Sequence, residues 1–151
     1  PVNSQYATVK IAVSSVLSGD HSAAGIADEV GNTKINNPFS GQNESYIESP
    51  YSYNSLTDFQ NNIHSIENVW YGGVQGKRSE YSFSNYFKKY DAATGKRVED
   101  AIANALKQIA AIKAPFVKNI KDPQCANAIK ACQELNDALT AASDFIGKNN
   151  K

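Results

Sequence analysis

The 151-residue sequence contains no methionine and only two cysteines. Because translation starts at methionine, we expect the chain to be a processed form or a fragment of a longer protein. Cys125 and Cys132 are seven residues apart, which on a helix would separate their Cα atoms by about 10.5 Å. A disulfide requires a separation of about 4.4–6.8 Å. We therefore expect no bridge within the chain and two buried cysteines that act as small apolar residues.

The sequence also lacks an excess of charge of either sign and any long apolar run. It has 15 basic and 15 acidic residues, a formal net charge of zero, whereas nucleic-acid binders usually carry a basic surplus. No segment approaches the roughly 20 apolar residues of a membrane span. These absences argue against a nucleic-acid partner and against a membrane span. The length favours one domain with a full-sized core.

Apolar residues recur at helical spacing in four segments, and neither a strand pattern nor a tandem repeat is visible. The first segment covers residues 4–34, with a bend or break predicted near Gly19–Asp20 because each glycine weakens a helix by about 1 kcal/mol. The second helix is predicted to start at Asn54 or Ser55 and to end at Gly72–Gly73. The third and fourth segments carry regular heptads and are expected to span residues 96–117 and 122–146.

Four amphipathic helices with one apolar face each predict an all-α fold, an antiparallel four-helix bundle that forms a single domain over residues 1–151. Two of the connections are unusual. Residues 36–53 form a long polar loop before the second helix, and loops of this length are usually functional or disordered. Residues 74–95 form an irregular connection after it, with a short amphipathic helix around residues 81–90.

The second helix carries the candidate metal ligands. His64 and Glu67 are three residues apart and project from one face, which Tyr71 extends. Such a pair can supply two metal ligands, or it can act as an oriented imidazole–carboxylate pair in acid–base chemistry. A zinc site needs three or four ligands, and His21 is a conceivable third. The alternative is a satisfied pair at a surface or an interface.

A second group of polar residues lies just before and inside the start of this helix: Glu48, Ser49, Ser52, Asn54 and Asp58. Capping and turn chemistry alone would explain Asn54 and Asp58. The aromatic residues are unevenly distributed as well, since seven of the eight Tyr and the single Trp lie between Tyr46 and Tyr90. This concentration indicates either a binding surface or packing of the long connections onto the bundle.

Two runs in this part of the chain resemble segments of imelysin-like proteins. Glu48-Ser-Pro-Tyr-Ser-Tyr-Asn54-Ser-Leu-Thr-Asp58 is similar to the family's E-S-x-[FY]-S-x-N-[ST]-x-x-D. Asn62-Ile-His-Ser-Ile66-Glu-Asn68-Val69-Trp-Tyr-Gly72 is similar to the N-x-x-x-I-x-N-V-Y-x-G that follows it there. Residues 25–38 also look like the family's helix that leads into the loop, so the resemblance is continuous over residues 25–73.

The resemblance implies a protein of two similar helical-bundle halves. This chain would be the C-terminal half, and its partner would be the N-terminal half of the same protein. The family's first half carries a G-x-H-x-x-E motif, and His64-Ser-Ile-Glu67 resembles its counterpart, with Asn62 in place of the glycine. The resemblance further implies a bacterial cell-envelope protein, periplasmic or lipid-anchored, that is linked to iron uptake.

Three functions are consistent with the residues and the resemblance. In the first, a cleft between the halves binds a metal ion, iron or zinc, or an iron-related ligand, with His64 and Glu67 at the metal. In the second, suggested by the classification of some family members, a metallopeptidase holds zinc across the cleft and a carboxylate activates water. In the third, this half supports a site in the N-terminal half. The residues expected to line the cleft are Glu48, Ser52, Asn54, Asp58 and Tyr71.

Overall fold

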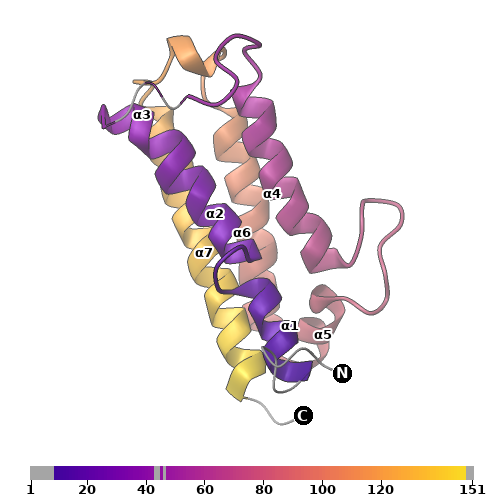
Figure 1. The fold of residues 1–151 in the computed structure, drawn as a ribbon. Helices are drawn as coiled ribbons and strands as arrows, with labels where there is room; N and C mark the ends of the chain where they lie inside the picture. Colours follow the sequence, from indigo (N-terminus) through magenta and orange to yellow (C-terminus); the bar gives the residue numbers. More distant parts are fainter. Residues whose placement is uncertain (1–8, 43–44, 46, 149–151) are drawn as a thin grey trace.

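The computed structural model describes residues 9–42, 45 and 47–148, and within these residues there is no strand. The predicted all-helical fold is confirmed, and Figure 1 shows long helices lying side by side. In chain order the elements are α1 (Val9–Leu17), α2 (Ala23–Asp28), the π-helix η1 (Glu29–Asn36), α3 (Asn37–Ser40), α4 (Ser55–Tyr71), α5 (Phe83–Tyr90), α6 (Ala92–Ala110), the 3₁₀-helix η3 (Phe116–Lys118) and α7 (Gln124–Lys148).

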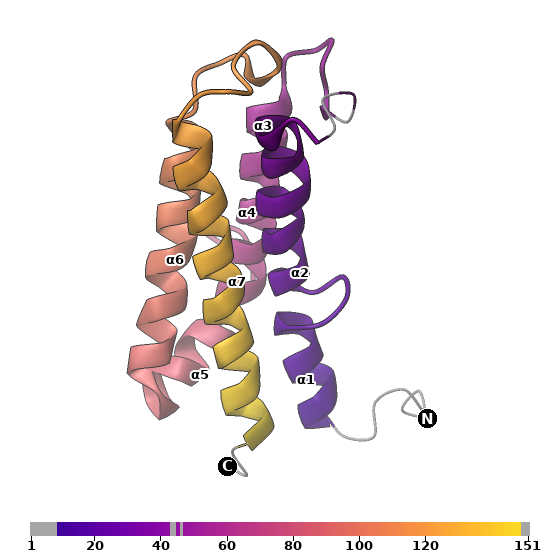
Figure 2. The ribbon, with the colours of Figure 1, turned by 90° about the vertical axis from the view of Figure 1, so that its left-hand side faces the viewer.

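Helix α7 packs against several of the other helices. It contacts α6 and also α1, α2 and η1, which follow one another along its length (Figures 1 and 2). Helix α4 packs against α6 and α2, so the helices enclose a common core. Full burial of a large apolar side chain contributes about 1.5–3 kcal/mol. The largest buried side chains include Leu17, Ile35, Phe59, Ile63, Ile66, Trp70, Phe87, Ile109, Phe116, Leu135 and Leu139.

The break predicted near Gly19–Asp20 is confirmed, and it separates α1 from α2. Both Gly19 and His21 have positive φ angles, +130° and +58°. Glycine adopts such angles without a steric cost. Ser22 then begins α2, because its hydroxyl oxygen accepts a hydrogen bond from the Gly25 amide at 3.1 Å. The chain continues in the same general direction after the turn (Figure 2).

The helical structure then extends further than the sequence predicted. Residues 37–40, expected at the start of the polar loop, form α3, which follows η1 without a break. Burial explains the extension, because Ile35 and Pro38 lie inside although their neighbours in sequence are polar. Pro38 lies in the first turn of α3, at its junction with η1. Gly41, with a φ of +79°, ends the helix.

The third predicted helix is displaced toward the N-terminus: residues 96–117 were expected, and α6 starts and ends earlier. The early start is due to Asp91, whose Oδ1 accepts a hydrogen bond from the Thr94 amide at 3.1 Å and caps the helix. The helix ends before Pro115, whose ring and missing N–H disrupt helical geometry. Phe116, which falls within the predicted range of this helix, is instead buried in η3.

Helix α7 carries its predicted apolar stripe, with both cysteines in it. Cys125 and Cys132 are buried free thiols, as predicted. Burial raises the pKa of Cys125 to about 11 and that of Cys132 to about 12, so neither is a ready nucleophile. Cys132 instead packs closely against η1. A Cβ added to Gly31 would lie only 2.8 Å from the Cβ of Cys132.

Candidate functional site

Helix α4 carries both groups of candidate site residues, and its buried face fixes where they point. Asp58 and Glu67 are nine residues apart, which corresponds to about 2.5 turns and roughly 13.5 Å along the axis. They therefore lie toward opposite ends of α4 and on opposite sides of its apolar stripe. The structure divides the candidates into two clusters. The stripe between them consists of Ser55, Phe59, Ile63, Ile66 and Trp70.

The first group, the N-terminal cluster, consists of Glu48, Ser49, Ser52, Asn54, Ser55 and Asp58. The Ser55 hydroxyl donates a hydrogen bond to the Glu48 carbonyl oxygen, and the Ser49 hydroxyl donates to Asp58 Oδ2 at 2.6 Å. Asn54 occupies the N-cap position of α4, but its side chain makes no capping hydrogen bond. Ser52 is exposed and donates a long 3.4 Å hydrogen bond to the Ser49 carbonyl. These contacts tie the loop to the first turn of the helix.

The Glu48 side chain of this cluster reaches a different helix. Its Oε2 is shielded from solvent and lies 3.2 Å from the Lys34 ammonium, at an angle unsuited to a hydrogen bond. Lys34, on η1, also pairs with Glu29 at 3.4 Å. Lys34 is mostly buried, with 17% of its side chain exposed. The pair therefore joins the loop to η1, and the N-terminal cluster is engaged in holding the polar connection in place.

The second group, the C-terminal cluster, consists of His64, Glu67, Tyr71 and Arg78. His64 Nδ1 lies 2.8 Å from Glu67 Oε2, and Arg78 Nη2 donates to Glu67 Oε1 at 2.7 Å. The Arg78 guanidinium also stacks 3.8 Å from the centre of the Tyr71 ring. Arg78 comes from the connection that leaves the C-terminal end of α4, beyond Gly72–Gly73 (Figure 1). Both carboxylate oxygens of Glu67 are therefore engaged.

Tyr71 is held as a neutral phenol. Partial burial raises its pKa, and the carboxylate of Glu99 on α6 raises it further, while the Arg78 guanidinium opposes the shift. Glu99 is itself fixed, because Oε1 accepts hydrogen bonds from Ser84 Oγ at 2.6 Å and from Trp70 Nε1 at 3.4 Å. A protonated Tyr71 can donate or accept a hydrogen bond.

The aromatic residues between the two connections divide between packing and exposure. Trp70 is fully buried and stacks on Phe83 and Phe87 of α5, with ring centroids 6.0 and 5.3 Å apart. By contrast, Tyr51 and Tyr81 are 95% and 87% exposed. Tyr46 lies outside the described residues. Packing thus accounts for Trp70 and its stacking partners and leaves Tyr51 and Tyr81 at the surface.

The C-terminal cluster can take part in ligand binding but does not form a complete metal site. Glu67 accepts from two partners, so it orients His64 and leaves Nε2 of that ring for a ligand. His64 is suitably placed, with 53% of its side chain exposed. Across the described part of the chain, no three His, Cys, Asp or Glu side chains gather as a metal site would require. His21, in the turn between α1 and α2, does not provide the third ligand.

Sequence reasoning missed the residues that fix these clusters. Arg78, which no pattern in the sequence singled out, is the partner of Glu67. The signal was the glycine pair, because Gly72 has a φ of +69° and Gly73 a φ of +146°, which reverses the chain beside α4. A Cβ at Gly73 would lie 2.5 Å from the Lys77 carbonyl oxygen, so only glycine allows this turn.

Known proteins match both the sequence and the fold. The family model for imelysin matches residues 8–142. The chain belongs to the imelysin family. The structure of an imelysin peptidase from Bacteroides ovatus matches 97% of the chain with a TM-score of 0.89 and 31% sequence identity. A protein from Parabacteroides distasonis, named as an iron-regulated protein A precursor, matches 91% of it with a TM-score of 0.83 and 30% identity.

The chain is much shorter than these imelysin relatives. It spans 43% of the Bacteroides ovatus protein and 42% of the Parabacteroides distasonis protein. No curated protein matches it. Within the described residues, no helix combines the length and the apolar character that crossing a membrane would require.

Proposed function

We propose that this chain is the C-terminal helical half of a bacterial cell-envelope protein linked to iron uptake. In this proposal, the half contributes one side of a cleft that binds iron, zinc or an iron-related ligand. The His64–Glu67 pair carries the proposal. The name of the Parabacteroides distasonis relative, an iron-regulated protein A precursor, supports the envelope and iron roles. Their greater length supports a second half of the same protein as the partner.

The geometry of the pair suits a metal-bound histidine. Since an ionised carboxylate only accepts hydrogen bonds, His64 donates through Nδ1 to Glu67 at 2.8 Å, and Nε2 is then the basic nitrogen. A carboxylate on the far nitrogen is the usual support of a metal-bound histidine, because it fixes the ring and raises its basicity. Arg78 holds the carboxylate from its other side. His64 would thus bind the metal directly, with Glu67 positioning it and Tyr71 beside it, and other ligands would come from the partner half.

Elemental analysis by mass spectrometry tests this proposal directly. The whole protein, with both halves, would be purified without affinity tags or chelators. We expect near-stoichiometric iron or zinc in the wild type, and its loss in His64→Ala and Glu67→Ala. Ser52→Ala, an exposed change in the N-terminal cluster, is the matched control and should keep the metal. An absence of metal after incubation with iron and zinc salts would refute direct binding of either metal by this pair.

A supporting role for this half is the second candidate, and one observation favours it. Both oxygens of Glu67 already have partners within this chain, so the pair is satisfied without a ligand. In that case His64→Ala and Glu67→Ala would leave the metal content and the activity of the whole protein unchanged. Changes at Trp70 or Tyr81 would disturb its assembly instead.

A metallopeptidase activity is the third candidate, supported by the name of the Bacteroides ovatus relative. It requires zinc held by ligands from both halves and a carboxylate that activates water. Peptide cleavage by the whole protein should then be lost on chelation and in His64→Ala. Cleavage that survives both treatments would exclude a zinc mechanism that uses this histidine.

A further inference from the structure

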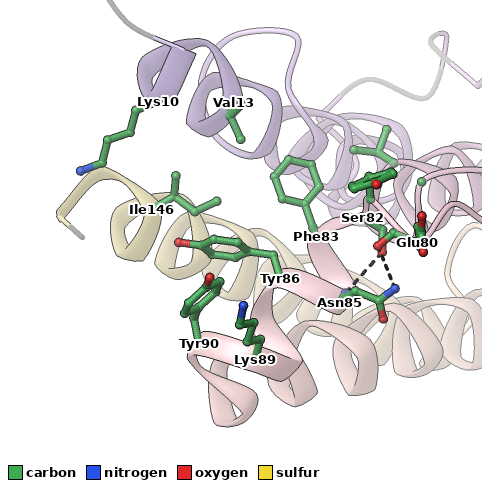
Figure 3. A pocket seen from close by; sticks show the side chains of 13 residues that line it. Lys10, Val13, Glu80, Ser82, Phe83, Asn85, Tyr86, Lys89, Tyr90 and Ile146 are labelled. Carbon is green, nitrogen blue, oxygen red and sulfur yellow. Dashed lines mark hydrogen bonds between the residues drawn. The ribbon is translucent and has the colours of Figure 1, made fainter. Parts of the chain in front are cut away.

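A groove of about 1140 Å³ opens at the end of the molecule where α1, α4, α5 and α7 meet (Figure 3). None of His64, Glu67 and Arg78 lines it. It approaches α4 at Val69, two residues from Glu67, and two residues turn a helix by about 200°. The groove therefore lies on the other side of α4 from the C-terminal cluster and is separate from it.

The walls of the groove are mainly apolar and come from four separate helices. Val13 of α1, Val69 of α4, Phe83 of α5 and Ile146 of α7 all line it. Val13 and Val69 are 37% and 38% exposed. Single exposed apolar residues are common on protein surfaces. Several that converge on one concavity are typical of a binding site.

The polar groups of the groove are sorted by charge along its length. Figure 3 shows Lys10 at one end and Glu80 at the other. Tyr86 and Tyr90 lie nearer the Lys10 end, with ring centroids 4.8 Å apart. The Lys89 ammonium lies 5.0 Å from the centre of the Tyr90 ring. One end thus offers two cations and two phenols, and the other offers a carboxylate.

We propose that this groove binds a small molecule with an elongated apolar body and one anionic end, of the class of medium-chain fatty carboxylates. The carboxylate would lie beside Lys89 and the phenols of Tyr86 and Tyr90, where it is attracted, and the apolar chain would follow Val13, Val69 and Phe83. The reverse orientation places the anion beside Glu80 and is disfavoured. A second copy of this chain is a poor occupant, because two identical concave surfaces cannot fill each other.

Titration calorimetry of the whole protein with dodecanoate, below its aggregation concentration, tests this inference. We expect saturable binding with one molecule per chain. Dodecyltrimethylammonium has the same apolar chain and the opposite charge, so it should bind at least roughly 10-fold more weakly. Equal affinities for the two amphiphiles, or no saturable binding of dodecanoate, would overturn the proposal. An absence of saturable dodecanoate binding is also expected if another part of the protein fills the groove, and it overturns the proposal in that case too.

Variants locate the binding within the groove. Lys89→Gln should weaken dodecanoate binding about 2- to 5-fold, the range of an exposed ion pair. Lys130→Gln on α7, an exposed lysine outside the groove, is the matched control and should have no effect. Val69→Asp should weaken binding more than about 10-fold, because a carboxylate would stand in the apolar wall. If the Val69→Asp variant loses its helical circular dichroism signal, Val69→Ser is used in its place. Equal effects of Lys89→Gln and Lys130→Gln would overturn the assignment.

This inference is independent of the proposed metal site. Val69→Asp should leave the metal content of the whole protein unchanged, and His64→Ala should leave dodecanoate binding unchanged. Metal binding at His64–Glu67 and dodecanoate binding in the groove can therefore be refuted independently of each other.

Discussion

The two ends of α4 differ in what their polar side chains do. At the N-terminal cluster, the Ser49 hydroxyl and the Glu48 carbonyl are hydrogen-bonded to α4 and the Glu48 carboxylate pairs with Lys34, so these contacts hold a long loop. At the C-terminal cluster, Glu67 is also saturated, but its bonds fix an exposed imidazole. The first arrangement stabilises the loop, whereas the second leaves the His64 imidazole exposed to a ligand.

This difference shows why motif residues have to be divided by their contacts. Both clusters lie in the part of the sequence that resembles the imelysin family, so resemblance alone does not separate them. The contacts do, because those of the N-terminal cluster tie the loop to the helix and to Lys34, whereas those of Glu67 orient an exposed His64 ring. Variants at each end of α4 therefore test the two roles separately.

Removal of the aromatic anchor beneath the C-terminal cluster should have the largest effect. Trp70→Ala deletes a fully buried ring that stacks on Phe83 and Phe87, and such truncations cost about 3–5 kcal/mol. The free energy of unfolding in urea measures the loss. Val69→Ala, at the exposed neighbouring position, is the control and should cost less than about 1 kcal/mol. A similar small loss for both variants would show that the stack does not anchor this end.

At the opposite end, the loop should depend on Asp58. Asp58→Ala removes the acceptor of the Ser49 hydroxyl, and a hydrogen bond to a charged group contributes about 1.5–3 kcal/mol. A double-mutant cycle with Ser49→Ala in urea unfolding isolates this interaction. Ser52→Ala should change stability by less than about 0.5 kcal/mol, since that hydroxyl is exposed. A coupling energy near zero would mean that the N-terminal cluster does not hold the loop.

The junction between α5 and α6 provides a pH-dependent comparison. Asp91→Ala should lose about 1 kcal/mol through loss of a helix cap. The Thr94 hydroxyl and amide donate to Asp91 and lower the pKa of its carboxyl below the usual value. Its stabilising contribution is therefore fully present above the unfolded pKa of about 3.9, and it is lost as the pH falls through the lower folded value. Unfolding measured from pH 7 to pH 2 should show the variant and the wild type converging only below about pH 4; convergence at higher pH would contradict this assignment.

Arg78→Ala should have the smallest effect on global stability, about 0.5–1 kcal/mol, because its ion pair and ring contact are partly exposed. Its effect should be local. Amide hydrogen exchange in residues 74–81 should become faster, since Arg78 joins this connection to α4. Lys77→Ala is the neighbouring control and should leave the exchange unchanged. Equal exchange in both variants would show that Arg78 does not hold the connection.

Regular patterns in the sequence predicted most of the fold. The stripe of α4, the heptads of α7 and the break at Gly19 follow from local spacing and glycine content, and each is seen in the structure. The extension through α3 was missed because Pro38 and its polar neighbours are typical of a loop, and only tertiary burial makes them helical. Likewise, Asp91 starts α6 four residues early through a cap that the heptad pattern does not contain.

The candidate site was less predictable, because its partners are distant in sequence. The spacing of His64 and Glu67 predicted one face and a contact, and the contact is present. Arg78, which lies eleven residues beyond Glu67, reaches it only because the glycine pair reverses the chain. No local pattern indicates that Lys34 meets Glu48 across two elements.

Zinc and iron titrations of the whole protein would be run in parallel on the wild type, Glu67→Gln and Asp58→Asn. They test directly whether the C-terminal cluster of α4, and not its N-terminal cluster, serves a ligand. If the C-terminal cluster serves the ligand, Glu67→Gln should weaken metal binding roughly 10- to 100-fold, as loss of a carboxylate that orients a metal-bound histidine does. Asp58→Asn should bind as the wild type does. Unchanged affinity in Glu67→Gln, or a loss confined to Asp58→Asn, would contradict the division of α4 into a structural end and a ligand-binding end.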